Sequence, residues 1–256
     1  MPKSKWNLNT IYISERLQES LRPISRCAMT TVVAPMGYGK TTAVEWYLAE
    51  RAGAEAPYIV RISVYSSNLA IFWKSVQDAF ARAGFAFLRE YDCPTDGASG
   101  GLLIDDLCHA LTGEKSCYIF IDDFHLLTDK RAPGFLCALA GRLPPNVHLI
   151  LASRDLVLPA AELVRLGGKV YQIGTAQLRL NHTELAVYTK RCGTAHSDEQ
   201  IDTLLYYSEG WFSAVYLNLR MFSEHGVLPD PNSDISSIFT AAMIDPLPEK
   251  QREFLA

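Results

Sequence analysis

The sequence predicts an α/β fold, with a mainly parallel five-stranded sheet that is flanked by helices and followed by a small all-helical subdomain. Short segments rich in β-branched residues alternate with amphipathic helical segments over the first two thirds of the chain. A glycine-rich turn joins the first of these strands to a helix, and only helical patterns follow about residue 176. Alternating strands and helices are typical of βαβ units, whose parallel strands are covered on both faces.

The first predicted elements surround the glycine-rich turn. A helix over residues 13–21 has apolar residues spaced by four, and Pro23 closes it. The next segment, "CAMTTVVA" (27–34), is predicted to be a strand because it is short and rich in β-branched residues. A helix then begins at Lys40 and runs to Gly53, which we predict to be its C-cap.

The next segment predicts a second strand and a second helix. "YIVRISV" (58–64) is the strand, and residues 68–84 form the helix, with Asn68 as its N-cap and Gly84 at its end. From residue 85 to 101 turn-forming residues dominate, and the composition predicts an irregular loop.

Two segments share the tripeptide Ile-Asp-Asp. "LLIDDLCHAL" (102–111) places its apolar residues on one helical face, so its two aspartates are expected on a helix surface. "YIFIDDFHLL" (118–127) begins with an unbroken apolar run, as does a strand buried on both faces. We therefore expect Asp122 and Asp123 to follow a strand and to be the functional pair.

The remaining elements complete the sheet and begin the helical part. Asn181 and Glu184 match a capping box at the start of a helix. The other predicted elements are helices near 132–142 and 160–166, strands over 147–153 and 169–174, and further helices to about His225 that are split at Gly210.

Composition restricts the class of protein. The 256 residues are 48% hydrophobic and 20% charged, and no apolar stretch reaches the roughly 18 residues that a membrane helix needs. The six cysteines form no C-x-x-C pair and no secretory leader is recognisable, so free thiols and a cytoplasmic location without membrane association are expected. The six histidines lack metal-ligand spacing and are interpreted as surface or satisfied core residues.

The charge distribution argues against direct DNA binding. The net charge is −4, and residues 197–256 contain ten acidic residues and three basic ones, a net charge of −7. Nucleic-acid binding depends on clustered lysine and arginine that neutralise phosphates. A pure DNA-binding module is therefore the weakest alternative.

The turn "APMGYGKTT" (34–42) resembles a phosphate-binding loop and predicts a P-loop NTPase domain. Gly37 and Gly39 would let backbone N–H groups converge on an anion at a helix N-terminus. Lys40 would reach the β and γ phosphates, Thr41 would ligate Mg²⁺, and Thr42 would contact the α phosphate. The alternative is a chance Gly-Lys-Thr-Thr string at a strand-to-helix turn.

The loop departs from the usual pattern at its first position, where Ala34 replaces glycine. Alanine is the smallest replacement, and Pro35 restricts the same turn by fixing its own φ. Met36 and Tyr38 complete the predicted nucleotide-binding loop. We expect the cradle for phosphates to persist.

Charged residues follow two later strands. Asp122 would hold Mg²⁺ through water, and Asp123 would either polarise an attacking water or simply hydrogen-bond within the site; a solvated strand end is the alternative for both. Arg154 would sense the γ phosphate, or would form a surface salt bridge with Asp155. The strand between the two motifs in the sequence favours the P-loop branch in which the two motif-bearing strands are separated in the sheet.

The motifs together resemble the MalT-like branch of the STAND signalling ATPases. They are "APMGYGKTT", "IFIDDFHLL", "LILASRD", "QIGTAQLRLNHTEL" and "SEGWFSAVYLNL", in this order. The resemblance implies that Gly37 to Thr42 bind the phosphates of ATP or ADP, that Asp122 and Asp123 form the Walker B pair, and that Arg154 is the sensor. It also places Ile13 and Arg16 beside the base. Phe212 and Ser213 depart from the small residues or proline found in many relatives.

The resemblance also implies a switch and a domain plan. ADP would hold a closed monomer, whereas ATP and an inducer would favour self-association, with DNA read by a LuxR-type C-terminal domain absent here. The expected parts are a segment flanking the base (1–26), the P-loop domain (27–175), a helical arm (176–228), and a linker with the start of a winged-helix domain (229–256). The sequence thus predicts a regulatory module with slow, Mg²⁺-dependent ATP hydrolysis; the alternatives are a non-hydrolysing ADP-bound scaffold and a small-molecule kinase.

Overall fold

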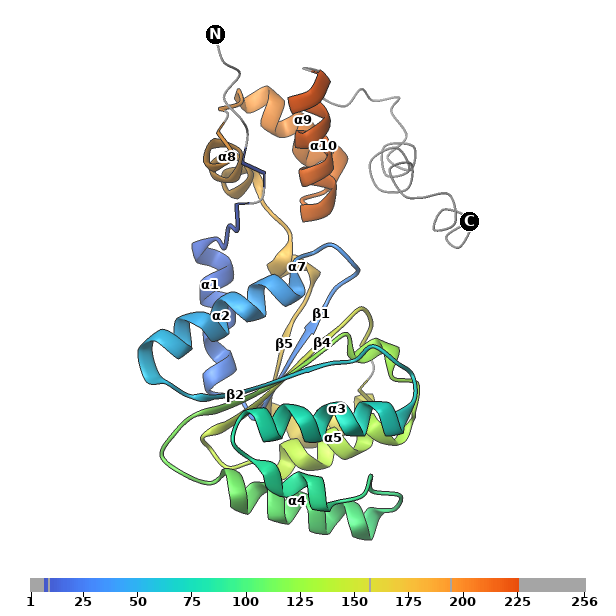
Figure 1. The fold of residues 1–256 in the computed structure, drawn as a ribbon. Coiled ribbons are helices and arrows are strands. Elements are labelled where there is room, and N and C mark those ends of the chain that lie inside the picture. Colours follow the sequence, from blue (N-terminus) through green and yellow to red (C-terminus); the bar gives the residue numbers. More distant parts are fainter. Residues whose placement is uncertain (1–6, 9, 157, 194, 226–256) are drawn as a thin grey trace. The chain divides into compact units, whose positions relative to one another are not determined.

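The computed structural model describes residues 7–8, 10–156, 158–193 and 195–225 (Figure 1). The chain divides into two compact units. Glu15–Leu178 is an α/β unit, and the described residues before it join the described part of 179–225 in a helical unit. The predicted start of a winged-helix domain, residues 229–256, lies outside the described residues. Within the described ranges, no helix combines the length and the apolar character needed to span a bilayer.

The α/β unit is built on a five-stranded sheet in which every strand pair is parallel. The order across the sheet is β2-β3-β4-β1-β5. The predicted fold class is therefore confirmed, and so is the separation of the two motif-bearing strands, because β4 lies between β1 and β3. The strands are β1 (Met29–Val33), β2 (Tyr58–Ser63), β3 (Cys117–Asp122), β4 (Val147–Ser153) and β5 (Val170–Ile173).

Helices cover both faces of this sheet (Figure 1). One face carries α1 (Glu15–Leu21) and α2 (Lys40–Glu55), and the opposite face carries α3 (Leu69–Arg82), α4 (Gly97–Leu111) and α5 (Arg131–Arg142). The shorter elements of this unit are η1 (Arg22–Ser25), η2 (Ala86–Glu90), η3 (Phe124–Leu126), α6 (Ala160–Leu166), η4 (Gly167–Lys169) and α7 (Thr175–Leu178).

The central strands are apolar throughout because both of their faces are buried. Every residue of β4 is buried, and so are the first five of β3. Ile119 and Ile121 join the core cluster beneath α3, α4 and α5, whereas the ring of Tyr118 packs edge-on against Tyr47 of α2 at 5.9 Å. Burying each large side chain stabilises the fold by about 1.5–3 kcal/mol, so these strands anchor both layers.

Helix α4 begins earlier than the sequence indicates. The predicted loop over residues 85–101 is wrong in part, since it contains η2 and the first turn of α4. The reason is the cap: Asp96 accepts a hydrogen bond from Ser99 N at 2.8 Å in a capping box, which starts a helix despite the glycines that follow. The two aspartates of α4, Asp105 and Asp106, are exposed as predicted.

Helix α2 ends later than predicted. Gly53 lies inside the helix, and Ala56, with φ of 46°, is the C-cap residue. An ion pair of 2.9 Å between Arg51 and Glu55 spans the last turn and supports the extension, because residues four apart face each other on a helix. The predicted N-cap of α3 is confirmed, since Asn68 accepts from two backbone N–H groups.

The helical unit contains α8 (His182–Arg191), α9 (Asp198–Ser208) and α10 (Phe212–His225). The capping box of α8 is confirmed, because Asn181 and Glu184 exchange hydrogen bonds of 2.9 Å. The segment before α1 packs in the same unit, where Tyr12 stacks on Tyr188 at a centroid distance of 6.1 Å. The core of the unit consists of Leu180, Leu185, Tyr188, Cys192, Ile201, Leu204, Val215 and Leu219.

Gly210 joins α9 to α10 at a point of close backbone contact. Its carbonyl accepts a hydrogen bond of 2.9 Å from Leu180 N, and its φ is +73°. A Cβ at this position would lie 2.2 Å from Leu180 O, closer than a real contact allows. Only glycine satisfies both constraints.

We predict that Gly210→Ala destabilises the helical unit. Gly193→Ala is the matched control, because Gly193 also has positive φ (+103°) but a Cβ there meets no atom within 4 Å. In the control, backbone strain should lower the free energy of unfolding by about 1–2 kcal/mol. Gly210→Ala should lower it by clearly more. Chemical unfolding followed by circular dichroism measures the difference, and equal losses for the two variants would contradict the role of the Leu180 contact.

Candidate functional site

The glycine-rich loop leads from the carboxyl end of β1 into α2. Gly37 and Gly39 have φ of 81° and 76°, which lie in the left-handed region. Gly39 is the N-cap residue of α2, and it has no side chain with which to satisfy the first N–H groups of the helix. The loop therefore presents backbone donors at the positive end of a 16-residue helix, an arrangement suited to binding an anion.

Ala34 is a core residue of the strand-to-loop junction. It is 1% exposed, and its N–H donates to Ser153 O at 3.3 Å. The alanine in place of the usual first glycine thus packs inward and extends the pairing of β1 with β4. Its methyl group stabilises the base of the loop.

Lys40 is held against the loop that precedes it. Its Nζ donates to Ala34 O at 2.7 Å and to Pro35 O at 3.0 Å, and the residue is 8% exposed. Burial lowers the pKa of Lys40, an effect opposed by the negative charge of Asp123. Two of the three donors on the ammonium are therefore directed to backbone carbonyls, and an incoming anion would have to replace them.

Thr41 and Asp122 join α2 to the end of β3. Thr41 Oγ1 donates to Asp122 Oδ2 at 2.8 Å, and Asp123 N donates to Asp122 Oδ1 at 2.9 Å. Burial raises the pKa of Asp122, and the bond from Thr41 opposes this rise. A hydroxyl and a carboxylate side by side are hard oxygen ligands of the kind that Mg²⁺ prefers. The residues that the structure describes include no cluster of three His, Cys, Asp or Glu able to hold a metal.

Asp123 and His125 form a second pair at this edge. Asp123 has φ of 54°, and its side chain is 51% exposed. The His125 side chain is only 10% exposed, and its Nδ1 lies 4.0 Å from Asp123 Oδ1, too far for a hydrogen bond. Burial lowers the pKa of His125, so the ring is neutral near pH 7.

His125 is not the satisfied core histidine that the sequence suggested. Neither ring nitrogen has a hydrogen-bond partner among the described residues, although both are buried. The charges of Arg154, Asp123 and Lys40 all act on its pKa, which places it among the predicted site residues. The feature of the sequence that could have identified His125 as a site residue is its position two residues after Asp123.

Arg154 follows β4 at the same edge of the sheet. Its Nη2 donates to Met36 Sδ at 3.8 Å, which connects it to the loop, and its charge lowers the pKa of Lys40. The contacts of the described residues include no ion pair between Arg154 and Asp155. The structure thus brings Lys40, Asp122, Asp123 and Arg154 into one electrostatic neighbourhood.

The other predicted site residues lie in several places. Thr42 is exposed in the first turn of α2. Arg16 lies in α1, where its Nη1 donates to Ala176 O at 3.1 Å. Ile13 belongs to the helical unit, and Arg16 belongs to the α/β unit. Contacts of Ile13 and Arg16 with a nucleotide base therefore stay a prediction, as do the roles of the other site residues.

Among curated proteins, the chain is similar to the HTH-type transcriptional regulators MalT of Yersinia pestis and Yersinia pseudotuberculosis. It is 24% identical to them over 212 residues, which cover 82% of this chain and 23% of those proteins. The chain thus corresponds to about a quarter of their length. No family model matches the sequence.

Solved structures share the fold. A STAND protein with a tetratricopeptide repeat sensor from Pyrococcus horikoshii matches with a TM-score of 0.63 and 16% identity, over 98% of this chain and 35% of that one. A Walker-type ATPase of Pyrococcus abyssi matches with a TM-score of 0.57 and 12% identity, over 94% of this chain and 74% of that one. The predicted resemblance to MalT-like STAND proteins is confirmed.

We predict that Asp122→Asn stabilises the nucleotide-free protein at neutral pH. The native state raises the pKa of this carboxyl, so folding disfavours its charged form, and the penalty applies above that raised pKa. Asparagine can retain both hydrogen bonds, accepting from Asp123 N and donating to Thr41 Oγ1.

The stabilisation should decrease at low pH, where Asp122 becomes protonated in both the folded and the unfolded protein. We expect a higher unfolding midpoint than wild type at about pH 7 and a smaller gain at about pH 4, close to the ordinary pKa of aspartate. Thermal unfolding without nucleotide or Mg²⁺ measures this gain, with Asp155→Asn, which changes an exposed carboxylate, as the control. A midpoint below wild type at pH 7 would show that the charge of Asp122 stabilises the fold.

Proposed function

We propose that this chain is the ATP/ADP-binding regulatory module of a bacterial transcription activator, in which the bound nucleotide controls self-association. The observation that carries the proposal is the hydrogen bond between Thr41 and Asp122, which joins a glycine-rich loop at a helix N-terminus to a carboxylate at the end of the next-but-one strand. Loop, lysine, hydroxyl and carboxylate are the groups that Mg²⁺-nucleotide binding requires.

Each group has a distinct role in this proposal. The backbone N–H groups from Gly37 to Thr42 and the Lys40 ammonium bind the phosphates, and Lys40 exchanges its bonds to Ala34 and Pro35 for phosphate oxygens. Thr41 and Asp122 hold Mg²⁺, with Asp122 acting through water. When bound, Mg²⁺ neutralises charge on the phosphates. Pro35, Met36 and Tyr38 complete the loop around them, and Ile13 and Arg16 flank the base.

Hydrolysis would depend on Asp123 and Arg154. The half-exposed carboxylate of Asp123 orients a water for attack on the γ phosphate, and Nδ1 of the buried His125 ring lies 4.0 Å from it. Arg154, in contact with the loop through Met36, responds to the charge of the γ phosphate. We propose slow turnover, because a switch requires each nucleotide state to persist long enough to bias a conformational equilibrium.

The inducer and the DNA would be recognised elsewhere in the full protein. The matched regulators are HTH-type proteins of which this chain covers 23%. We propose that residues 1–26, 27–175, 176–228 and 229–256 are the flanking segment, P-loop domain, helical arm and start of a winged-helix domain. In this plan self-association requires ATP and inducer, and a LuxR-type domain outside this chain reads DNA in the cytoplasm.

We predict that Lys40→Ala weakens ADP binding by about 10- to 100-fold, the loss expected from removing a charge-assisted hydrogen bond. Isothermal titration calorimetry with Mg²⁺ and ADP measures the affinity. Lys74→Ala is the control, since this exposed lysine lies on α3 and pairs with Asp78. Unchanged affinity in a folded Lys40→Ala protein would remove the phosphate-binding role of the loop.

We predict that Asp123→Asn slows ATP hydrolysis at least 100-fold, the lower end of what a positioned general base contributes, while ADP affinity changes little. Single-turnover measurements separate the chemical step from product release. A rate that the substitution leaves unaltered would favour the non-hydrolysing, ADP-bound scaffold. Phosphate transfer to a small hydroxyl compound would instead favour a kinase.

A further inference from the structure

A cavity of about 420 Å³ lies in the α/β unit, apart from the nucleotide site. It lies between the sheet and the helices α3, α4 and α5, which cover the face of the sheet opposite α1 and α2 (Figure 1), and the turn before α4 also lines it. No residue of the loop from Ala34 to Thr42 lines it, nor does Asp122, Asp123 or Arg154. The proposed nucleotide site therefore does not account for this space.

The lining of the cavity is apolar. Aromatic rings form much of its wall, and β-branched side chains of the sheet form its floor. The wall includes Phe72, Trp73, Phe80 and Phe135, and the floor includes Ile62, Ile119 and Ile121. Contact between such a surface and another apolar surface lowers the free energy, whereas contact with a charged group contributes little stabilisation.

Polar groups at the cavity already have protein partners. Arg131 binds the carboxylate of Asp129 through two hydrogen bonds of 3.0 and 2.7 Å, and Arg142 donates to Asp105 at 2.9 Å. Asp96 is engaged in the capping box of α4. Because Arg131 and Arg142 are in ion pairs and Asp96 accepts hydrogen bonds from Ser99, the cavity offers no strong site for an ionised group.

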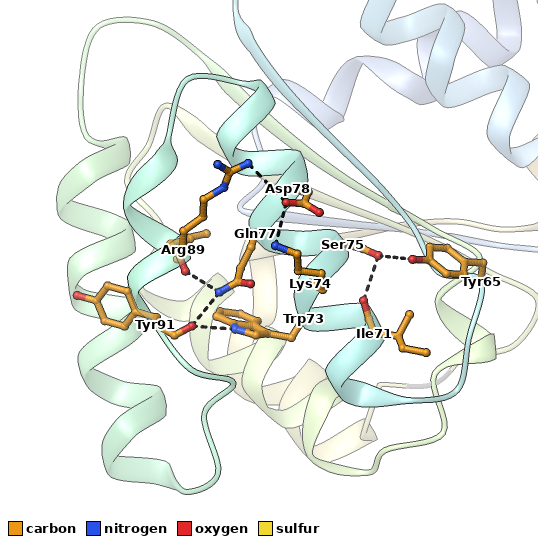
Figure 2. Close-up of polar contacts among 10 residues, drawn as sticks. Tyr65, Ile71, Trp73, Lys74, Ser75, Gln77, Asp78, Arg89 and Tyr91 are labelled. Atoms are coloured by element: carbon orange, nitrogen blue, oxygen red, sulfur yellow. Dashed lines mark hydrogen bonds and ion pairs between the residues drawn. The ribbon is translucent and has the colours of Figure 1, made fainter.

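One wall of the cavity is held in place by hydrogen bonds between α3 and the segment that follows it. Gln77 Nε2 donates to Leu88 O at 3.0 Å and to Tyr91 O at 2.9 Å, and Trp73 Nε1 donates to the same Tyr91 carbonyl at 3.0 Å (Figure 2). These bonds tie η2 and the following turn to α3. They fix the Trp73 ring as a wall of the cavity while satisfying its only polar atom.

We infer that this cavity is a binding site for a small, uncharged hydrophobic molecule. Protein interiors pack closely and leave few voids larger than a water molecule, whereas small-molecule sites occupy about 300–1,000 Å³. The volume falls in the second range, the lining is apolar, and the neighbouring charged groups have protein partners. These features select the ligand by shape and by its lack of charge.

Gly100 of α4 offers a direct test. It is buried and lines the cavity, and a Cβ there would lie 3.5 Å from Phe135 Cδ2 and 3.9 Å from Pro94 Cβ, in ordinary contact. Alanine therefore fits without displacing a neighbour. The larger side chain of Gly100→Leu would extend into the cavity, and both substitutions favour the helix because glycine is a poor residue in a helix interior.

The experiment uses the neutral fluorescent probe N-phenyl-1-naphthylamine with the whole chain. Wild type and Gly100→Ala should bind one equivalent with increased probe emission, and Gly100→Leu should bind at least about tenfold more weakly, a loss of 1.4 kcal/mol. Energy transfer from tryptophan to the bound probe should fall in Trp73→Phe, since Trp73 lines the cavity. Ala132→Leu, at a buried alanine of α5 that also lines the cavity, serves if Gly100→Leu does not fold.

Two results would overturn the inference. One is the absence of saturable probe binding by the wild-type protein. The other is wild-type affinity in a folded variant that fills the cavity, which would place the probe elsewhere. Neither measurement includes nucleotide, so the outcome is independent of Lys40 and of the proposed function.

Discussion

The common direction of β1, β3 and β4 is the constraint on which the candidate site depends. Parallel strands end at one edge of the sheet, and the register that pairs Val33 with Ser153 places the start of the loop beside Arg154. The end of β3 brings Asp122 within a hydrogen bond of Thr41, a residue 81 positions earlier in the chain. Ligands of open α/β sheets bind at such edges because residues distant in sequence converge there.

Lys40 and Thr41 already have protein partners within the site. The Lys40 ammonium binds carbonyls of its own loop, and the Thr41 hydroxyl binds Asp122. These bonds keep the loop formed while two carboxylates and two cations lie close together. A ligand that enters must exchange bonds of comparable strength, so its net affinity is smaller than the sum of its contacts suggests. The same exchange would make the binding selective for a highly charged anion accompanied by a cation.

Much of the fold could be predicted from the sequence, because β-branched runs, helical periodicity and side-chain caps are local signals. The five strands and the cap at Asn181 are examples. The start of α4 could not, since its glycine-rich first turn resembles a loop and depends on Asp96 and on burial of Gly100 against Phe135. The unsatisfied ring of His125 could not be predicted, because the lack of partners for a buried ring is visible only in three dimensions. The cavity has no sequence signal, as its lining comes from three helices and the sheet.

Strand β3 serves two surfaces at once. Ile119 and Ile121 form part of the cavity floor, and the next residue, Asp122, belongs to the candidate magnesium pair. A displacement of this strand by a fraction of an ångström would alter both. Thermodynamic linkage is reciprocal. A hydrophobic molecule that shifts β3 would therefore change the affinity for nucleotide, and nucleotide would change the affinity for the hydrophobic molecule by the same factor. Strand β3 would then be the element through which each ligand influences the other.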